Sequence, residues 1–350
     1  MTQIKAKKQD APKARKVTPR KTKELDVPTK PRPRTKKISS SDNKDLDALA
    51  KPISRTKKKP SSDENESTAL ETQSTPKTVH PKNPLNDLTS TEWIPETVSV
   101  WNQKGLGANH PDSVIERQHP APFSFTDVSR LVKFFTKKGG VVLDPFSGVG
   151  STLKACAIEG RKGIGFELEQ KYVDLTIERL TSEVGNAEGQ TVIQGDSRKL
   201  VKKLEENSLD FVVTSPPYWN ILHKVDHKVK QERIAKNLDV KYSNNEADLG
   251  NIHDYPEFLK ALSLILGGCA KALKPKKYMA VIVSDFRDKS KYVMFHADIA
   301  TALAPYGLEM RGLTVLYQRH KRIFPYGYPY AYVPNIHNQY IVIFQKSTKL

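Results

Sequence analysis

The pattern of apolar and polar residues predicts alternating helices and strands from about residue 126 onward. Val128, Leu131, Val132 and Phe135 recur at helical spacing after Thr126, a favourable N-cap residue, so a helix is predicted up to about residue 138. Further helices are predicted over residues 151–159, 170–181, 255–273 and 295–303, and strands over 141–143, 162–166, 191–193, 209–213, 279–283, 308–317 and 339–344. This alternation favours an α/β fold with a mainly parallel sheet and helices on both faces.

Polar residues stand at the carboxyl ends of four predicted strands. These are Asp144, Glu167, Asp196 and Ser215. Ligands of open α/β sheets bind beyond the carboxyl ends of the strands. The sequence therefore predicts that these four residues lie around one binding site.

The first 92 residues lack this alternation. All 28 aromatic residues lie at or after Trp93, and residues 1–60 carry 20 Lys and Arg against 6 Asp and Glu, a net charge of +14. Such a segment cannot bury enough apolar surface to offset its chain entropy. We therefore predict a disordered basic tail over residues 1–92 and one folded domain over residues 93–350, a length that suffices for a large α/β domain.

The basic clusters of the tail are interrupted by prolines, which disfavour helix formation. Positive charge spread along a flexible tether suits weak contact with nucleic acid through counterion release. A solvated tail that only aids solubility is the alternative, because charge runs are common in proteins.

Composition argues against several classes of protein. No apolar run approaches the ~18 residues of a membrane span, and no apolar segment follows the basic N-terminus as in a secretory signal. The two cysteines, Cys156 and Cys269, are too few for a disulfide framework or a zinc site, so they are predicted to be core residues of a cytoplasmic protein. The nine histidines show no metal-binding spacing, and no metal is predicted.

A glycine-rich turn joins the first predicted strand to the helix over residues 151–159. Phe146, Gly148 and Gly150 lie in this turn. Small residues let the backbone approach a ligand, and the N-terminus of the following helix favours negative charge. Leu153 occupies the position of the third glycine in the common dinucleotide-binding motif, which argues against an ordinary dinucleotide site.

Acidic residues after the turn indicate a nucleoside ligand. Glu167, 17 residues after Gly150, is positioned to accept hydrogen bonds from two ribose hydroxyls, and Asp196 could accept from an adenine amino group. Each acid alone is more often a solvated carboxylate at a strand end. Three acids at successive strand ends, Asp144 included, favour a bound nucleoside.

The segment over residues 214–219 reads Thr-Ser-Pro-Pro-Tyr-Trp. Pro216 and Pro217 fix φ and remove two donors, which leaves a carbonyl free to accept, and Ser215 adds a side-chain oxygen. Tyr218 and Trp219 add aromatic faces. Methylation of an exocyclic base amine needs such acceptors, because they localise a lone pair that is otherwise delocalised, while an aromatic face holds an extruded base. A rigid Pro-Pro turn with packed aromatics is the structural alternative.

The sequence Leu-Asp-Pro-Phe-Ser-Gly-Val-Gly-Ser-Thr over residues 143–152, together with residues 214–219, resembles the S-adenosylmethionine-dependent DNA amino-methyltransferases, which make N4-methylcytosine or N6-methyladenine. The resemblance covers roughly residues 95–346. It implies a Rossmann-like methyltransferase fold with a seven-stranded, mostly parallel sheet whose last strand is antiparallel. It assigns S-adenosyl-L-methionine to Asp144, Phe146, Gly148, Gly150, Glu167 and Asp196, and catalysis to Ser215, Pro216, Pro217 and Tyr218.

The resemblance also implies partners and a reaction. The substrate is double-stranded DNA with a flipped target base, and a cognate restriction nuclease is expected as in restriction-modification systems. Serine at position 215, where some members have aspartate, favours cytosine N4 as the acceptor. An N6-adenine enzyme, an RNA base methyltransferase and a DNA-binding module without catalysis are the alternatives. The histidine segment over residues 119–123 is similar to the family segment that closes over the methionine end of the cofactor.

Gly150 precedes Thr214 in the chain, whereas the members with this histidine segment usually have the opposite order, so the motifs look permuted. Three segments are candidates for DNA recognition: residues 223–241, which are dense in charge, residues 318–334, which combine basic residues with tyrosines, and residues 93–118. An exposed helical flap and aromatics packed on the sheet are the alternatives for the first two.

Overall fold

The computed structural model describes residues 78–348 apart from 104–105, 107–109, 186, 222–230, 232–233, 237 and 320. The predicted disordered tail therefore lies outside the described residues as far as position 77. All of the elements below belong to the compact unit Thr72–Leu350.

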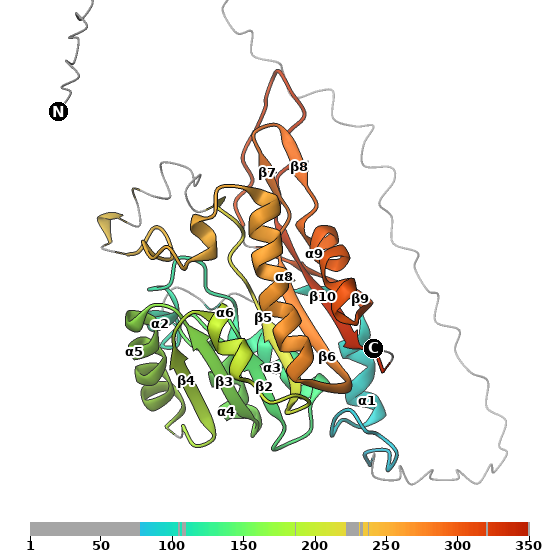
Figure 1. The fold of residues 1–350 in the computed structure, drawn as a ribbon. Helices are drawn as coiled ribbons and strands as arrows, with labels where there is room; N and C mark the ends of the chain where they lie inside the picture. Colours follow the sequence, from blue (N-terminus) through green and yellow to red (C-terminus); the bar gives the residue numbers. More distant parts are fainter. Residues whose placement is uncertain are drawn as a thin grey trace, which may run out of the picture. The chain divides into compact units, whose positions relative to one another are not determined.

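An eight-stranded sheet forms the centre of the described domain (Figure 1). Its strands, in spatial order, are β1 (Val100–Asn102), β9 (Leu308–Tyr317), β10 (Asn338–Lys346), β6 (Leu273–Val283), β5 (Leu209–Thr214), β2 (Val141–Asp144), β3 (Lys162–Glu167) and β4 (Gln190–Gln194). Only β10 runs antiparallel to its neighbours, β6 and β9, within this sheet. The Rossmann-like fold and the antiparallel last strand are confirmed.

The strand count differs from the prediction by one. All seven predicted strands are present, and β1 adds an eighth at the edge through parallel pairing with β9. Of the three residues of β1 only Trp101 is buried, so the strand carries too little apolar pattern to be recognised.

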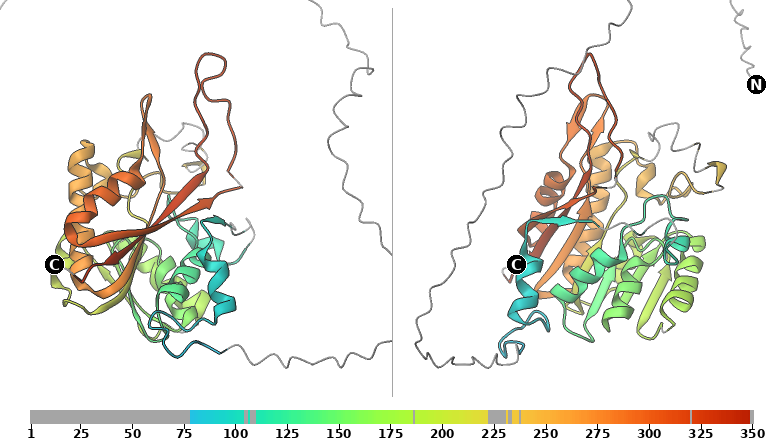
Figure 2. Two further views of the ribbon diagram at one scale, coloured as in Figure 1. Left: turned by 90° about the vertical axis from the view of Figure 1, so that its right-hand side faces the viewer. Right: turned by 180° about the vertical axis from the view of Figure 1, so that it is seen from behind.

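Helices cover both faces of the sheet (Figures 1 and 2). One face carries α3 (Phe125–Phe135), α4 (Ser151–Glu159) and α5 (Gln170–Arg179), and the other carries α6 (Ser197–Leu200), α8 (Tyr255–Ala272) and α9 (Phe295–Leu303). The short elements are α1 (Ser90–Trp93), α2 (Ser113–Glu116), η2 (Ile94–Thr97), η3 (Leu180–Val184), η4 (Val201–Lys203), η6 (Leu249–Asn251), η7 (Ala304–Tyr306) and the hairpin of β7 (Phe286–Asp288) with β8 (Lys291–Val293).

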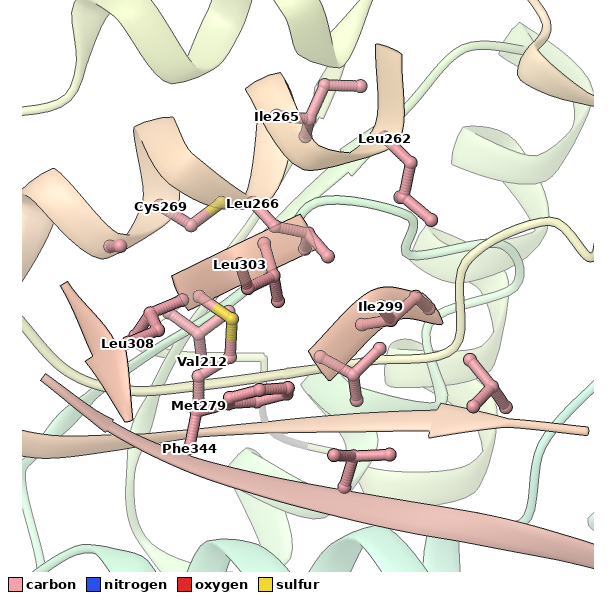
Figure 3. Close-up of a cluster of buried hydrophobic side chains, with 14 of the residues drawn as sticks. Val212, Leu262, Ile265, Leu266, Cys269, Met279, Ile299, Leu303, Leu308 and Phe344 are labelled. Atoms are coloured by element: carbon pink, nitrogen blue, oxygen red, sulfur yellow. The ribbon is translucent and has the colours of Figure 1, made fainter. Parts of the chain in front are cut away.

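Alternate residues of the central strands supply two separate cores. Val212 of β5 packs with Leu266 of α8 and Leu303 of α9 (Figure 3), whereas its neighbours Phe211 and Val213 pack on the α3 side. Side chains alternate across a strand, so a strand covered on both faces must be apolar at every position. This explains why residues 211–213 read as one buried run.

Two details at the start of the domain differ from the prediction. The helix begins one residue before Thr126, with Ser124 as the N-cap, and Val128 N donates to Ser124 O at 3.2 Å. The folded part also begins before residue 93: Asn86 is fully buried and its Nδ2 donates to Phe134 O at 2.6 Å. Leu88 is buried as well. The prediction relied on aromatic residues, and this segment has none. The buried side chains of Asn86 and Leu88 attach it to the domain instead.

Cys156 and Cys269 are both buried, as predicted, and burial raises the pKa of each thiol. Among the described residues, no helix combines the length and the hydropathy needed to cross a membrane. The same residues contain no group of three or more His, Cys, Asp or Glu side chains arranged to hold a metal ion.

Candidate active site

A pocket opens at the carboxyl ends of β2, β3, β4 and β5. It encloses about 680 Å³ of atom-free space, its open mouth included. The predicted site residues that line it are Phe146, Gly148, Glu167, Asp196, Ser215 and Pro217. The structure thus brings together residues from four strand ends, and it leaves Asp144, Gly150, Pro216 and Tyr218 outside the pocket lining.

Gly148 and Gly150 are each suited to the turn for a different structural reason. Gly148 has a φ of +51°, and a Cβ there would lie 3.3 Å from His119 Nε2, across the pocket. Gly150 has a φ of +75°, and a Cβ there would lie 2.5 Å from Thr176 Cγ2 of α5. Gly148 therefore keeps the pocket open, whereas Gly150 permits close packing of the turn against α5.

Asp144 is fully buried at the end of β2 and connects two loops. Its Oδ2 accepts from Thr152 Oγ1 at 2.5 Å, and its Oδ1 accepts from Thr214 Oγ1 at 2.6 Å and from Phe146 N at 3.0 Å. Burial raises its pKa to about 6 although these hydrogen bonds favour the ionised form. The carboxylate joins the glycine turn to the start of the Ser-Pro-Pro-Tyr loop.

Glu167 lies at the end of β3 with 9% of its surface exposed. Its Oε2 accepts from Gly148 N at 2.8 Å, and its Oε1 accepts from Glu169 N at 2.9 Å. Burial raises its pKa to about 7. The backbone of Leu168 also donates to this carboxylate, whose four lone pairs still leave capacity for a donor from a ligand in the pocket.

Asp196 follows β4 and is the N-cap of α6. Its Oδ1 accepts from Arg198 N at 2.9 Å, and Arg198 Nε lies 3.0 Å from Oδ1 and 3.1 Å from Oδ2. Burial raises the pKa of Asp196, but the hydrogen bonds and charge of Arg198 outweigh burial and lower it overall. The carboxylate lines the pocket in its ionised form.

A second wall faces the glycine turn. It contains His119 and Ala121, which belong to the histidine segment, and Tyr242 and Ser243, which follow the Ser-Pro-Pro-Tyr loop in the chain. The His119 ring lies 5.6 Å from the ring of Tyr242, centroid to centroid. The sequence did not identify Tyr242 or Ser243, because they stand in a polar segment without period or motif.

Buried charges hold the chain that precedes the histidine segment in place. Lys154 of α4 is 1% exposed and its Nζ lies 2.7 Å from Asp112 and 2.6 Å from Glu183. Arg179 of α5 is fully buried, and its Nη2 lies 3.0 Å from Glu116. The segment over residues 112–116 is thereby tied to the two helices that follow the glycine turn and the end of β3.

Arg179 also contacts the glycine turn itself. Its Nη1 donates to Val149 O at 3.3 Å and to Ser151 Oγ at 3.0 Å. Nothing in the sequence indicated this role of Arg179. An arginine among apolar residues gives no sequence signal that distinguishes a buried cation from a solvated one.

The Ser-Pro-Pro-Tyr loop follows β5, which pairs directly with β2. Ser215 Oγ lies 3.2 Å from Tyr218 Oη, and Tyr218 Oη accepts from Gln339 Nε2 at 2.8 Å. Pro216 is buried, and Pro217 lines the pocket. The ring of Tyr218 packs edge-on against Phe295, with centroids 6.2 Å apart, and its role as a face for the target base stays a prediction.

The prediction that Trp219 offers a second aromatic face is wrong. Trp219 is 6% exposed and packs in the core cluster with Tyr255 and Phe286. Its φ of +50° turns the chain sharply after Tyr218. The residue therefore anchors the end of the loop.

The three candidate recognition segments have different outcomes. Most of residues 223–241 lie outside the described residues. In residues 93–118, Trp101 is buried in the core beneath the guanidinium of Arg130, which lies 3.6 Å from the ring centroid. In residues 318–334, Tyr328 and Tyr330 are 81% and 94% exposed, so they do not pack against the sheet.

The chain is similar to known DNA methylases. A family model described as DNA methylase, for N6 and N4 methyltransferases, matches residues 5–178. Type II methyltransferase M.ScaI from Streptomyces caespitosus is 34% identical over 85 residues, which span 24% of this chain and 28% of that protein. Type II methyltransferase M.MjaI from Methanocaldococcus jannaschii is 31% identical over 111 residues, which span 30% of this chain and 35% of that protein. The chain thus covers about a third or less of the length of these relatives.

Solved structures show likeness at lower identity. TrmN from Thermus thermophilus has a TM-score of 0.40 and 18% identity, over 63% of this chain and 48% of that one. A TehB-like SAM-dependent methyltransferase from Corynebacterium glutamicum has a TM-score of 0.36 and 14% identity, over 63% of this chain and 87% of that one.

The pocket has the groups that S-adenosyl-L-methionine requires. Gly148 leaves space beside the backbone of the turn, because any side chain there would meet His119. Glu167 presents a carboxylate with free lone pairs to hydroxyl donors, and Asp196 presents a second carboxylate at the next strand end. Together with the match to the DNA methylase model and to the curated relatives, these features show that the chain belongs to the N4/N6 DNA amino-methyltransferase family and takes S-adenosyl-L-methionine as its cofactor.

Proposed function

We propose that the protein is a site-specific methyltransferase that transfers a methyl group from S-adenosyl-L-methionine to the exocyclic N4 amine of cytosine in double-stranded DNA. The observation that carries this proposal is the junction of two loops at one pocket. Gly148 of the glycine turn and Ser215 of the Ser-Pro-Pro-Tyr loop line the same pocket, and they follow the adjacent parallel strands β2 and β5. The permuted order of the motifs along the chain does not alter this neighbourhood.

The loop supplies acceptors for the hydrogens of the amine. Ser215 Oγ and the carbonyl of Pro216 are the proposed acceptors, and the two prolines hold the backbone in one φ region. Two acceptors favour a pyramidal nitrogen, whose lone pair is then available for attack. When bound, the cofactor supplies a methyl group on a positively charged sulfur, which leaves as a neutral thioether.

The protein acts mainly by positioning the two reactants and by preorganised hydrogen bonds. As the N–C bond forms and the S–C bond breaks, the nitrogen gains a positive charge that is relieved by loss of one amine proton. Ser215 is a poor base near neutral pH, so the proton leaves to solvent. The target base must be extruded from the duplex to reach the pocket, and Tyr218 is proposed to hold its face.

The choice of cytosine rests on Ser215 at the first position of the loop. The family resemblance associates serine there with cytosine N4 and aspartate with adenine N6, so N6-adenine methylation is the second candidate. An RNA base methyltransferase is the third, and a DNA-binding module without catalysis is the last. A cognate restriction nuclease is proposed as a partner on the same resemblance.

Mass spectrometry of nucleosides separates these candidates. Duplex DNA and RNA are each incubated with the protein and a labelled methyl donor, and label in N4-methylcytosine is expected. Label in N6-methyladenine or in RNA would replace the proposal by the corresponding alternative. Absence of label from both nucleic acids would leave only the binding module.

A serine variant tests the role of the loop. Ser215→Ala removes one acceptor, so it should slow single-turnover methyl transfer by about 10²-fold, by analogy with the loss of one preorganised hydrogen bond. Affinity for the cofactor should stay close to that of the unaltered protein. Ser208→Ala changes a serine just before the other end of β5 and serves as the control. Equal rates for both variants would remove Ser215 from the site.

A further inference from the structure

The long connection between β9 and β10, Gln318–His337, projects from the same sheet edge as the Ser-Pro-Pro-Tyr loop. We call this connection the finger. β6 runs parallel to β5, and β10 runs antiparallel to both β6 and β9, so β9 points the same way as β5. The chain that leaves β9 therefore emerges at the edge where the pocket opens. Figures 1 and 2 show the finger extending beyond the sheet next to the β7–β8 hairpin.

The tip of the finger exposes tyrosines. Tyr328, Tyr330 and Tyr332 are 81%, 94% and 91% exposed, and Ile323 nearby is 72% exposed. Apolar surface gathered in this way on a protein marks a site of interaction. Tyrosine in particular offers a flat face for stacking and a hydroxyl for hydrogen bonding.

Internal hydrogen bonds hold the finger in shape. At the tip, Tyr330 N and Ala331 N both donate to Gly327 O at 2.7 Å. Farther down, the side chain of Asn335 pairs with the backbone of Phe324, since Phe324 N donates to Oδ1 at 2.9 Å and Nδ2 donates to Phe324 O at 2.8 Å. These bonds present the tyrosines to solvent in a fixed arrangement.

The charge of the finger identifies the kind of partner. The sequence of Gln318–His337 contains Arg319, Lys321 and Arg322 but no Asp or Glu. Arg319 and Arg322 are exposed. Aromatic faces beside uncompensated cations suit a polyanion with stacked bases, in which phosphates meet arginines and bases meet the rings.

The root of the finger is linked to the proposed catalytic loop through one residue of β10. The two ends of the finger meet where Gln318 N donates to His337 O at 2.9 Å, and Gln318 Nε2 donates to Oε1 of Gln339 in β10 at 3.3 Å. Gln339 Nε2 in turn donates to Tyr218 Oη at 2.8 Å. Gln339 of β10 thus links the finger to Tyr218, and a ligand held by the finger lies on an element that is one side chain away from the proposed catalytic loop.

We propose that the finger is a DNA-contact element: its tyrosines stack on or between bases beside the target, and Arg319 and Arg322 contact the flanking phosphates. This inference rests on the proposed function and adds the element that engages the duplex.

The test compares variants of the full chain on a long DNA duplex of mixed sequence. The first variant is Tyr328→Ser, Tyr330→Ser, Tyr332→Ser, and the second is Arg319→Gln, Arg322→Gln. The control, Ile158→Ser, Ile177→Ser, removes two apolar side chains that are each 52% exposed on α4 and α5. Cofactor affinity, measured by calorimetry, reports whether each variant is folded.

The tyrosine variant should bind the duplex at least about fivefold more weakly, because stacking contributes about 1–3 kcal/mol per base. The arginine variant should lower the slope of log K against log salt by about 2, at about 0.9 per lost phosphate contact. The control should match the unaltered protein in both measurements.

Unchanged affinity and unchanged salt slope in folded variants of a protein that methylates DNA would overturn the inference alone. A protein without binding to or methylation of DNA would overturn the proposed function itself. If sedimentation shows that only the tyrosine variant loses self-association while its affinity for the duplex is unchanged, the partner of the finger is a second copy of this chain, and the DNA inference is overturned.

Discussion

The two sides of the pocket are built in opposite ways. On the side of β2 and β3, short turns lead directly into α4 and α5, and buried side chains such as Asp144 and Glu167 accept hydrogen bonds from the backbone of the turns. On the side of β5 and β9, long segments follow the strands, and the finger carries its largest side chains in solvent.

The proposed function assigns a different ligand to each side of the pocket. The cofactor is the same molecule in every turnover, so a site fixed by buried acids and cations can be complementary to it at all times. Under the proposed function, the other side admits a large polyanion, receives one extruded base and releases both. Elements with few buried contacts open at low free-energy cost, and they are the elements that such a cycle requires.

The largest expected effect concerns the buried cations of the cofactor side. Arg179→Met removes the ion-pair partner of Glu116 and one of the two partners of Glu183, which keeps Lys154, so the free energy of unfolding should fall by about 3–5 kcal/mol. Equilibrium denaturation measures this. The matched control is Arg311→Met, whose partner Glu309 lies 2.7 Å away with both side chains about half exposed. That change should lower the free energy of unfolding by about 1 kcal/mol or less. Equal costs for the two variants would show that burial does not distinguish the pairs.

An intermediate effect concerns the pH dependence of cofactor binding. The pKa of Glu167 is about 7 in the free protein, and hydroxyl donors from a ligand would favour the ionised form. Affinity for S-adenosyl-L-methionine should therefore rise with pH through about 7 and should fall by up to about tenfold per pH unit below it. Calorimetry over this range measures the profile.

Glu167→Gln should remove this part of the pH dependence, whereas the exposed control Glu178→Gln should retain it. The sign for folding is opposite. Since the pKa of Glu167 is raised from 4.5 to about 7, the folded state binds more protons in that interval, and the free energy of unfolding falls as pH rises through it. A variant with the same two profiles as the unaltered protein would exclude Glu167 from both roles.

The smallest effect is expected from the tail and should concern the DNA side alone. Deletion of residues 1–77 removes 21 Lys and Arg and 10 Asp and Glu, a net charge of +11, and should reduce the salt dependence of DNA binding. The free energy of unfolding and the cofactor affinity should not change. A truncated protein that does not fold, or an unchanged salt slope, would contradict this prediction.

Much of the fold follows from periodicity. The helices Ser151–Glu159 and Phe295–Leu303 have the predicted bounds, and every predicted strand is present, because each central strand is a short apolar run that ends at a polar residue. β1 and the docked segment around Asn86 were missed, because they bury single side chains and not periodic faces.

The site was only partly predictable for a related reason. Residues at strand ends, such as Glu167 and Ser215, share an edge as soon as the sheet is parallel. Tyr242 lines the pocket from a segment that does not follow a strand of the sheet, so its position could not be predicted in this way. The buried position of Arg179 depends on acidic residues elsewhere in the chain. Trp219 has the composition of a stacking residue, and only tertiary packing determines that it lies in the core.

The carboxylate of Asp144 accepts from Thr152 beyond the glycine turn and from Thr214 before the Ser-Pro-Pro-Tyr loop. Two binding events that both require this arrangement belong to one thermodynamic cycle. If the cofactor increases the affinity for the target base by some factor, the base must increase the affinity for the cofactor by the same factor. We therefore expect the buried carboxylate of Asp144 to couple the two binding events, so that binding of either the cofactor or the target base changes the affinity for the other by the same factor.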